Sequence, residues 1–156
     1  MRLTLLWVGK TRNPYLKALC EDYLERIRHL ASCEIVELRD AARGRDLDAA
    51  AVRQEEGRAM ARALPAGCRV VALDSGGRDL ASVQFARWLE EEQRLGTREL
   101  RFVVGGAEGL DAEIVRRAHL VLSLGRMTWT HEMARVLVLE QVYRALTILR
   151  GMPYHK

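Results

Sequence analysis

The chain has 156 residues, 49% of them hydrophobic and 29% charged, and a formal net charge of +4 at pH 7. This length suits a single domain with its own core, and we expect residues 1–156 to form one domain. The ordinary balance of apolar and charged residues argues against disorder. The mild basic excess suits an acidic partner such as RNA, although base-composition bias in the genome would give the same excess of arginine.

The sequence gives no support for a membrane protein or for a cysteine-based metal site. The longest nearly apolar segment, residues 136–149, is interrupted by Glu140, Gln141 and Arg144, so it is too short and too polar to span a bilayer. The first ten residues begin a strand-like alternation rather than a signal peptide, and we expect a cytoplasmic protein. The cysteines have neither disulfide nor zinc spacing, and we interpret them as small buried hydrophobic residues. They are Cys20, Cys33 and Cys68.

Apolar periodicity and turn residues predict five strands that alternate with five helices. The predicted strands span residues 2–8, 33–38, 69–73, 98–104 and 120–124. The predicted helices span residues 14–29, 47–64, 82–96, 111–118 and 131–150. Their expected caps are Asn13, Ser82, Asp111 and either Thr128 or Thr130. Residues 39–46 are charged and predict an exposed loop. Regular alternation of strand and helix predicts an α/β fold, a mostly parallel sheet with helices on both faces.

Two of the apolar strands end in glycine. Residues 102–104 run into Gly105 and Gly106, and residues 120–124 run into Gly125. In open α/β sheets ligands bind beyond the carboxyl ends of the strands, and glycine there lets the backbone approach a ligand closely. With Leu73 at the end of a third strand, these loops predict one ligand pocket. The alternative is that the glycines are ordinary turn residues.

The glycine loops match none of the common nucleotide or hydrolase motifs. The chain has no G-x-G-x-x-G fingerprint with a following acidic residue, no phosphate-binding G-x-x-x-x-G-K-[ST] and no G-x-S-x-G. No cluster of histidine, cysteine and carboxylate side chains has metal-ligand spacing, so we expect no metal. Residue types and spacing alone therefore indicate a nucleoside-like ligand of unspecified class.

The last predicted helix is apolar nearly all round, from Met133 to Leu149. Such a helix is buried on most sides, and a terminal helix of a small domain rarely finds that much cover within its own chain. We therefore expect a homodimer interface. The alternative is a helix threaded deep into its own fold.

Six motifs in register resemble one known family. They are V-G-K at 8–10, A-L-D-S-G-G-R at 72–78, F-V-V-G-G-A-E-G-L at 102–110, L-S-L-G-R-M-T-W-T-H at 122–131, A-R-V-L-V-L-E-Q-V-Y-R-A at 134–145 and the terminal P-Y-H-K. Together they resemble the ribosomal RNA large subunit methyltransferase H family of the SPOUT superclass, over the whole chain.

The resemblance implies a C-terminal trefoil knot, a homodimer, and S-adenosylmethionine bound by the knot loops. It also implies methyl transfer to N3 of a pseudouridine in a 23S rRNA stem-loop on the assembled ribosome. The residues implied for the cofactor are Leu73, Gly105, Leu124, Gly125, Arg126, Met127, Thr128 and Trp129. Those implied near the target base are His131, Tyr154, His155 and Lys156, with the tail completing the partner protomer's pocket.

The chain departs from the family pattern at three points. Thr130 replaces the usual proline before the histidine, Gly125-Arg126 replaces Ser-Lys, and Lys156 replaces a terminal arginine. The last change keeps the charge but loses the planar fork of donors. These departures leave open a non-catalytic RNA- or ribosome-binding protein with the same fold. On the residues alone, a small-nucleotide-binding α/β enzyme is a third hypothesis.

Several residues carry two interpretations. His155 is the first candidate to take the N3 proton, because histidine titrates near neutral pH; it alternatively orders the tail or contacts RNA. His131 contacts the base or a phosphate, or packs at its helix start. Trp129 stacks on a base or packs, and Glu108 offsets a sulfonium charge or holds its loop. The candidate phosphate contacts are Arg2, Arg12, Arg39, Arg43, Arg45, Arg126 and Lys156.

Overall fold

A computed structural model describes residues 1–40 and 45–156. Within those residues five strands alternate with five helices, as the sequence predicts. The strands are β1 (Arg2–Val8), β2 (Cys33–Leu38), β3 (Arg69–Asp79), β4 (Glu99–Val104) and β5 (Leu120–Ser123). The helices are α1 (Pro14–Arg28), α2 (Ala49–Arg62), α3 (Ser82–Arg94), α4 (Ala112–Arg117) and α5 (His131–Leu149). Arg43 and part of the predicted loop 39–46 lie outside the described residues.

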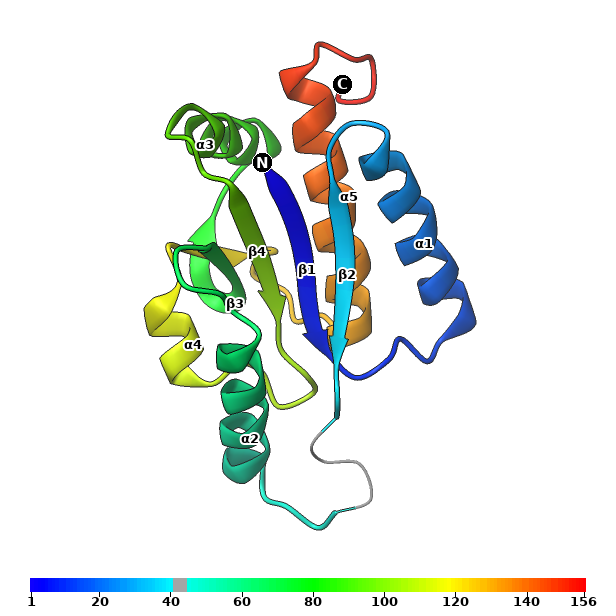
Figure 1. Ribbon diagram of the computed structural model, residues 1–156. Coiled ribbons are helices and arrows are strands. Elements are labelled where there is room, and N and C mark those ends of the chain that lie inside the picture. The colour runs from blue at the N-terminus through cyan, green and yellow to red at the C-terminus, as the bar shows by residue number, and fades with distance from the viewer. Residues whose placement is uncertain (41–44) are drawn as a thin grey trace.

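The strands form one parallel sheet in the order β2-β1-β4-β3-β5. Helices α1, α3 and α5 cover one face around a core that includes Ile27, Leu89 and Leu139. Helices α2 and α4 pack on the other face through Met60 and Ile114 (Figure 1). The expected parallel α/β sheet with helices on both faces is confirmed. The trefoil knot concerns how the chain is threaded, and it stays a prediction.

Strand β3 is longer than the sequence predicts. It leaves the sheet after Leu73, and Arg78 and Asp79 then pair with β5 again. The Asp74 carboxylate accepts from the Gly76 amide at 2.8 Å, which shapes the excursion as an Asx turn. A Cβ atom on Gly77 would lie 2.7 Å from the Val121 backbone. The sequence predicts that this strand ends at residue 73, whereas Gly77 lets it return to its neighbour.

The helix starts are set by local hydrogen bonds, and two differ from expectation. Helix α2 starts after Asp48, whose carboxylate accepts from the Ala51 amide at 2.7 Å, and not at Leu47. Helix α3 has Ala81 as its N-cap. Ser82 does not cap it, because its hydroxyl donates to Gln141 of α5 at 2.8 Å. The other expected caps, Asn13, Asp111 and Thr130, accept from amides of the first turn.

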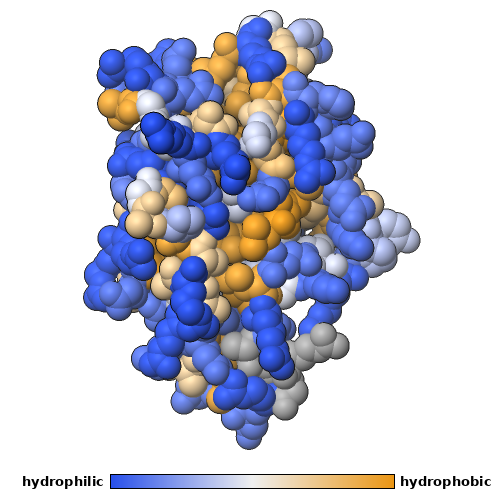
Figure 2. Space-filling model, viewed as in Figure 1, coloured by the Kyte–Doolittle hydropathy of each residue, from blue (hydrophilic) through white to orange (hydrophobic). Residues whose placement is uncertain are grey.

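Helix α5 packs against both α1 and α3 and has one fully buried side and one half-buried side. Its C-terminal end and the tail lie at the end of the molecule where β1 begins (Figure 1). Figure 2 shows the opposite face of the sheet, where hydrophobic side chains gather over the strands among charged ones. Val36 and Leu38 on the edge strand β2 are partly buried there.

Two smaller expectations concern burial. All three cysteines are free and buried, as expected, and burial raises the pKa of Cys20 to about 11 and that of Cys33 to about 12. In the part of the chain that the structure describes, no helix is both long and apolar enough to cross a membrane.

Candidate functional site: a pocket at the carboxyl ends of three strands

Register brings three strand ends into one row at the edge of the sheet. Leu73 of β3 pairs with Val104 of β4 on one side and with Leu122 of β5 on the other. Because the strands are parallel, their carboxyl ends, and the loops that follow them, lie at the same edge of the sheet. A pocket of about 510 Å³ lies there, within the range of small-molecule sites. The structure thus brings together the loops that the glycines predict.

The loop after β4 depends on close backbone approach. A Cβ atom on Gly105 would lie 2.5 Å from the carbonyl carbon of Gly109, closer than real contacts allow. Gly106 and Gly109 form a short antiparallel bridge, and Gly109 has a positive φ of 82°. The backbone therefore folds tightly back on itself and forms one wall of the pocket.

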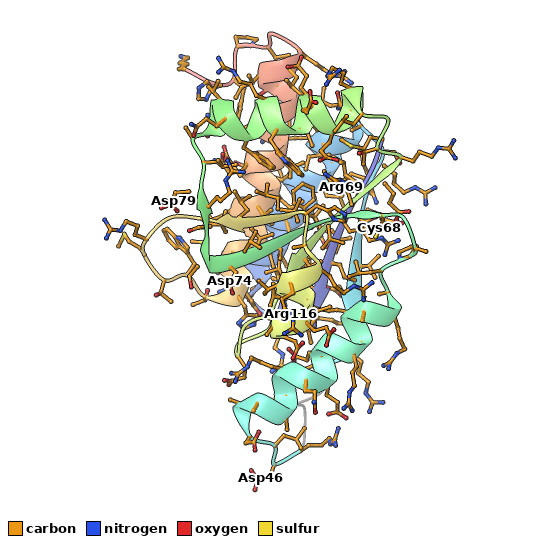
Figure 3. All side chains as sticks on the ribbon, turned by 90° about the vertical axis from the view of Figure 1, so that its left-hand side faces the viewer. Asp46, Cys68, Arg69, Asp74, Asp79 and Arg116 are labelled. Carbon is orange, nitrogen blue, oxygen red and sulfur yellow. The ribbon has the colours of Figure 1, made fainter. Side chains whose placement is uncertain are left out.

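The loop after β5 forms the facing wall. Gly125 has a φ of 106°, and its amide donates to the Ser123 hydroxyl at 3.1 Å. The indole N–H of Trp129 donates to the Leu124 carbonyl at 3.2 Å, so the loop closes on itself. Met127 is 75% exposed and Trp129 42%, an unusual exposure for large apolar side chains. In Figure 3 this loop projects beside Asp74 and Asp79 of β3, while Arg69 marks the start of that strand.

The sequence-predicted cofactor residues fall on this pocket with one exception. Those that line it are Leu73, Gly105, Leu124, Gly125, Met127, Thr128 and Trp129. Arg126 belongs to the same loop but does not line the pocket and is exposed. Sequence reasoning missed Asp74, Val104 and Ala134, which line it too. Asp74 and Val104 line the pocket because Leu73, which precedes Asp74, pairs with Val104 in the sheet.

His131 lies at the border of this pocket and a second one. It begins α5 after the Thr130 cap and lines both pockets. Burial, followed by the positive charge of Arg135, lowers the pKa of His131. The imidazole is therefore mostly neutral near pH 7 and able to accept a proton or a hydrogen bond.

The second pocket, of about 350 Å³, has charged side chains of both signs in its lining. It shares Gly106, Ala107 and His131 with the first, and its other lining includes Lys10, Arg12, Glu56 and Arg135. Glu56 and Arg135 are 4% and 1% exposed. Sequence reasoning missed both. A signal was present for Glu56, which stands on the buried stripe of its helix between Val52 and Met60, at a spacing of four residues each way.

Arg135 ties the start of α5 to the end of β1. Its guanidinium donates to the Thr11 hydroxyl at 2.9 Å and to the Val8 carbonyl at 2.5 Å, and it lies 5.1 Å from the Trp7 ring centroid. Glu132 beside His131 accepts from the Arg12 and Asn13 amides. Burial opposes ionisation of Glu132, but these amide bonds, together with the positive charge of Arg135, lower its pKa. The segment after β1 is thus fixed against the start of α5.

The three tail residues lie away from the pocket, although the tail turns back along α5. Its contacts fall nine and thirteen residues after His131, about 14 and 20 Å at 1.5 Å per residue. The Tyr154 hydroxyl donates to Glu140 at 3.0 Å, and its ring packs edge-on against Tyr143 at 4.8 Å. His155 lies 3.4 Å from Arg144, and Lys156 is exposed. Within one chain, therefore, only His131 of the four expected target-site residues borders the pocket.

The candidate phosphate contacts are dispersed. Arg12 is exposed and lies 3.7 Å from Asp40, and it lines a cavity of about 1110 Å³ together with Lys10 and Arg39. Arg45 forms a 2.7 Å ion pair with Glu55. Arg2 lies at the opposite end of the sheet. Of the candidate phosphate contacts, Arg12 lines the second pocket, and Arg126 belongs to the loop that forms one wall of the first.

The parallel α/β sheet, with a pocket between the loops after β3, β4 and β5, indicates the class of protein to which the chain belongs. A family model described as "Predicted SPOUT methyltransferase" matches residues 1–155. The fold also resembles a solved structure, a "Probable Methyltransferase" from Bordetella pertussis Tohama I. The TM-score is 0.57 at 14% identity, over 93% of this chain and 96% of that one. This likeness supports the fold alone.

Two proteins of similar sequence identify the family within this class of methyltransferases. The chain is 43% identical over 155 residues to "Ribosomal RNA large subunit methyltransferase H" of Geobacter sp. (strain M21), covering 99% of each protein. It is 44% identical over 156 residues to the protein of the same name from Gemmatimonas aurantiaca, covering 100% of each. The chain belongs to the ribosomal RNA large subunit methyltransferase H family of SPOUT methyltransferases.

Proposed function

We propose that this protein methylates 23S rRNA in the cytoplasm, using S-adenosylmethionine as the donor. The acceptor is N3 of a pseudouridine in a stem-loop, and the substrate is the assembled ribosome. The observation that carries the proposal is the pocket at the ends of β3, β4 and β5, to which seven of the eight residues expected to hold the cofactor contribute. Membership of the family supports the same activity.

The pocket fits a molecule of the size and chemistry of S-adenosylmethionine. Leu73, Leu122 and Leu124 offer apolar surface to an adenine ring, and the glycine loops offer backbone N–H and C=O groups. Met127 and Trp129 stand exposed at the rim, where a bound molecule would cover them. When bound, the cofactor supplies a methyl group on a positively charged sulfur.

The chemistry requires alignment and the removal of one proton. The pocket would have to hold the methyl donor in line with the acceptor N3, and the N3 proton would have to be taken up by a nearby group. His155 is our first candidate to accept that proton, because it is exposed in the tail. His131 borders the pocket and is mostly neutral, so it would orient the base or receive a hydrogen bond.

If His155 takes the proton and His131 orients the base, the two residues must meet at one site, which requires a homodimer. On its own chain the tail contacts Glu140 and Arg144, about 14 and 20 Å along α5 from His131, so it would reach a methyl-transfer site only on a second copy. The half-buried side of α5, which includes Leu137 and Ile148, offers a surface for that copy. In this arrangement each site combines the pocket of one protomer with the tail of its partner.

The test is transfer of a labelled methyl group to ribosomes that lack the modification. Intact ribosomes and separated large subunits would be assayed side by side, with and without the protein. We expect label in 23S rRNA, at the N3 position of a pseudouridine, with intact ribosomes preferred. Absence of label in both would overturn the proposal. Ribosome binding without affinity for S-adenosylmethionine would then favour a non-catalytic binding protein.

A further inference from the structure

The chain reverses its direction where helix α5 ends. Gly151 has a positive φ of 63°, and its amide donates to the Ile148 carbonyl at 3.1 Å. The Met152 amide donates to the Thr147 carbonyl at 2.9 Å. This pair of bonds is the Schellman arrangement, in which a glycine in the left-handed region ends a helix, and Pro153 cannot continue the helix. The tail therefore curls back over the end of α5 (Figure 1).

Tyr154 is the tail residue that docks on the helices. Its ring packs edge-on against Tyr143 with 4.8 Å between the centroids, and its hydroxyl donates to Glu140 at 3.0 Å. The hydroxyl of Tyr23, in α1, lies 3.4 Å from that of Tyr154. Because the Tyr154 proton is used on the Glu140 carboxylate, the Tyr23 hydroxyl is the donor to Tyr154. The tail is thus bonded to α1 and α5 at once.

Tyr23 is placed for this contact by the face of α1 on which it stands. Cys20 and Ile27, three residues before it and four after it, are buried and lie on the same face of the helix. The Tyr23 ring lies 6.2 Å from that of Tyr143 in α5. The Arg26 guanidinium lies 5.6 Å from the centroid of the Tyr23 ring. Packing and charge therefore hold the Tyr23 ring at the junction of α1, α5 and the tail.

Arg144 links the docked tyrosine to the histidine that follows it. Its guanidinium donates to Glu140 at 2.9 Å, lies 4.7 Å from the centroid of the Tyr154 ring and lies 3.4 Å from His155 Nδ1. Burial, followed by the bonds to Tyr23 and Glu140, raises the pKa of Tyr154, so its hydroxyl keeps its proton and remains a donor. His155 is exposed beyond these contacts.

We propose that Tyr23 is a positioning residue for methyl transfer: through Tyr154 it holds the tail of its own chain in the shape in which His155 enters the pocket of a partner protomer. This inference rests on the proposed function, in which the tail of one protomer completes the site of the other. A tail ordered in advance loses less conformational freedom when the site assembles. In this role Tyr23 acts through Tyr154 and His155 and not on the reacting atoms.

The experiment separates the hydroxyl of Tyr23 from its ring. Tyr23→Phe removes only the hydroxyl, and Tyr23→Leu removes the ring as well. The control is Leu24→Ala, which loosens the packing of α1 on the same core but leaves the three tyrosines in place. We would measure turnover on ribosomes that lack the methyl group and the Kd for S-adenosylmethionine. The order of the tail would be measured separately, from ¹⁵N relaxation of the Tyr154 and His155 amides.

We expect Tyr23→Phe to lower kcat by about 2- to 12-fold, the effect of one neutral hydrogen bond. Tyr23→Leu should lower kcat by at least ~10-fold, because the aromatic packing is lost too. The Kd for S-adenosylmethionine should not change, since Tyr23 does not line the pocket. Order parameters of the tail amides should fall below about 0.6 in Tyr23→Leu. Leu24→Ala should lower the Tm and leave kcat and the tail unchanged.

Mixed dimers show from which protomer Tyr23 acts. When a chain that lacks residues 154–156 pairs with a Gly105→Ala chain, the one undisturbed site uses the pocket of the first chain and the tail of the second. We expect Tyr23→Leu to lower turnover when it is placed in the Gly105→Ala chain, and to have no effect in the truncated chain. General destabilisation of α1 would lower turnover from either chain.

Three outcomes would overturn the inference. One is a Tyr23→Leu chain whose tail amides stay as ordered as in the wild type. Another is a mobile tail with unchanged or higher turnover, which would mean that the docked tail must detach before it acts. The third is an equal loss of turnover from either protomer of the mixed dimer. Failure of the proposed function is distinguishable, because the wild type would then methylate no ribosome, whereas the tail amides would still show whether Tyr23 holds the tail.

Discussion

The indole N–H of Trp129 donates to the carbonyl of Leu124, five residues earlier in the same loop, at 3.2 Å. This bond closes the segment between β5 and α5 into a compact turn. Both residues line the pocket, so the bond sets the shape of its wall before any ligand arrives. A wall ordered in advance costs less entropy when a ligand binds.

Replacing Trp129 with phenylalanine should weaken S-adenosylmethionine binding. The change keeps an aromatic ring but removes the N–H donor, and one neutral hydrogen bond is worth about 0.5–1.5 kcal/mol, or roughly a 2- to 12-fold rise in Kd. Isothermal titration calorimetry would measure it. Trp88→Phe is the matched control, because Trp88 packs on Phe85 of α3 and does not line the pocket. Equal Kd values for the two variants would contradict the role given to the bond.

Adding one methyl group at Gly105 should disable the pocket. The new Cβ atom would lie 2.5 Å from the Gly109 carbonyl carbon, so the loop must open. We expect Gly105→Ala to lower the free energy of unfolding by about 1–3 kcal/mol. Because the wall moves, we also expect a Kd for S-adenosylmethionine raised at least ~30-fold, about 2 kcal/mol. Urea unfolding and calorimetry would report the two effects.

The control for Gly105 is Gly96→Ala. Gly96 has a φ of 77° but no atom within 4 Å of its added Cβ, and it lies in the turn before β4. The left-handed backbone alone should cost about 1–2 kcal/mol, with no change in ligand affinity. Weaker binding in the Gly96 variant would show that general destabilisation, and not the Gly109 contact, explains the effect.

The order of elements, most strand boundaries and the place of the pocket follow from the sequence. They rest on local periodicity and on the rule for carboxyl ends of parallel strands. The return of β3 at Arg78 was not foreseen, because whether residues 74–77 end a strand or interrupt it depends on the neighbouring β5. Local sequence also does not reveal that Ser82 bonds to Gln141, because the partner lies 59 residues further along the chain.

The site was predicted less completely than the fold. The glycine loops could be predicted as the pocket because Gly105 allows a close backbone contact and Gly109 and Gly125 have a positive φ. Glu56 was missed although it interrupts an apolar stripe, since a charged side chain in a helix is usually solvated. The role of Tyr154 and His155 remains a prediction, because one chain holds them against Glu140 and Arg144 of α5 and a partner copy would have to bring them to a pocket.

Mixed dimers would test that arrangement of the tail. A chain that lacks Tyr154, His155 and Lys156 should lose turnover at least ~100-fold and keep its affinity for S-adenosylmethionine, because the pocket residues are untouched. The Gly105→Ala chain should also have low turnover, because its tail is intact but its pocket is disturbed. If each site uses the pocket of one protomer and the tail of the other, co-refolded mixtures of the two should regain activity that neither has alone. A mixture that stays inactive would mean that the tail serves the pocket of its own chain.

The stability of the protein should carry a signature of Glu56 between about pH 4.5 and pH 7. Burial raises the pKa of this carboxyl to about 7 from the ordinary 4.5. Between these values the folded chain binds more protons at this position than the unfolded chain does. The free energy of unfolding contributed by Glu56 is therefore fully present below pH 4.5 and is lost as the pH rises through 7.

Urea midpoints measured from pH 4.5 to pH 8 would isolate this effect as the difference between the wild type and Glu56→Gln. We expect the wild type to lose stability relative to the variant as the pH rises, and the difference to level off above pH 8. Glu55→Gln is the control: Glu55 is ion-paired to Arg45, which lowers its pKa, so any change would have the opposite sign. A flat difference for Glu56→Gln would mean that the carboxyl is solvated in the folded protein.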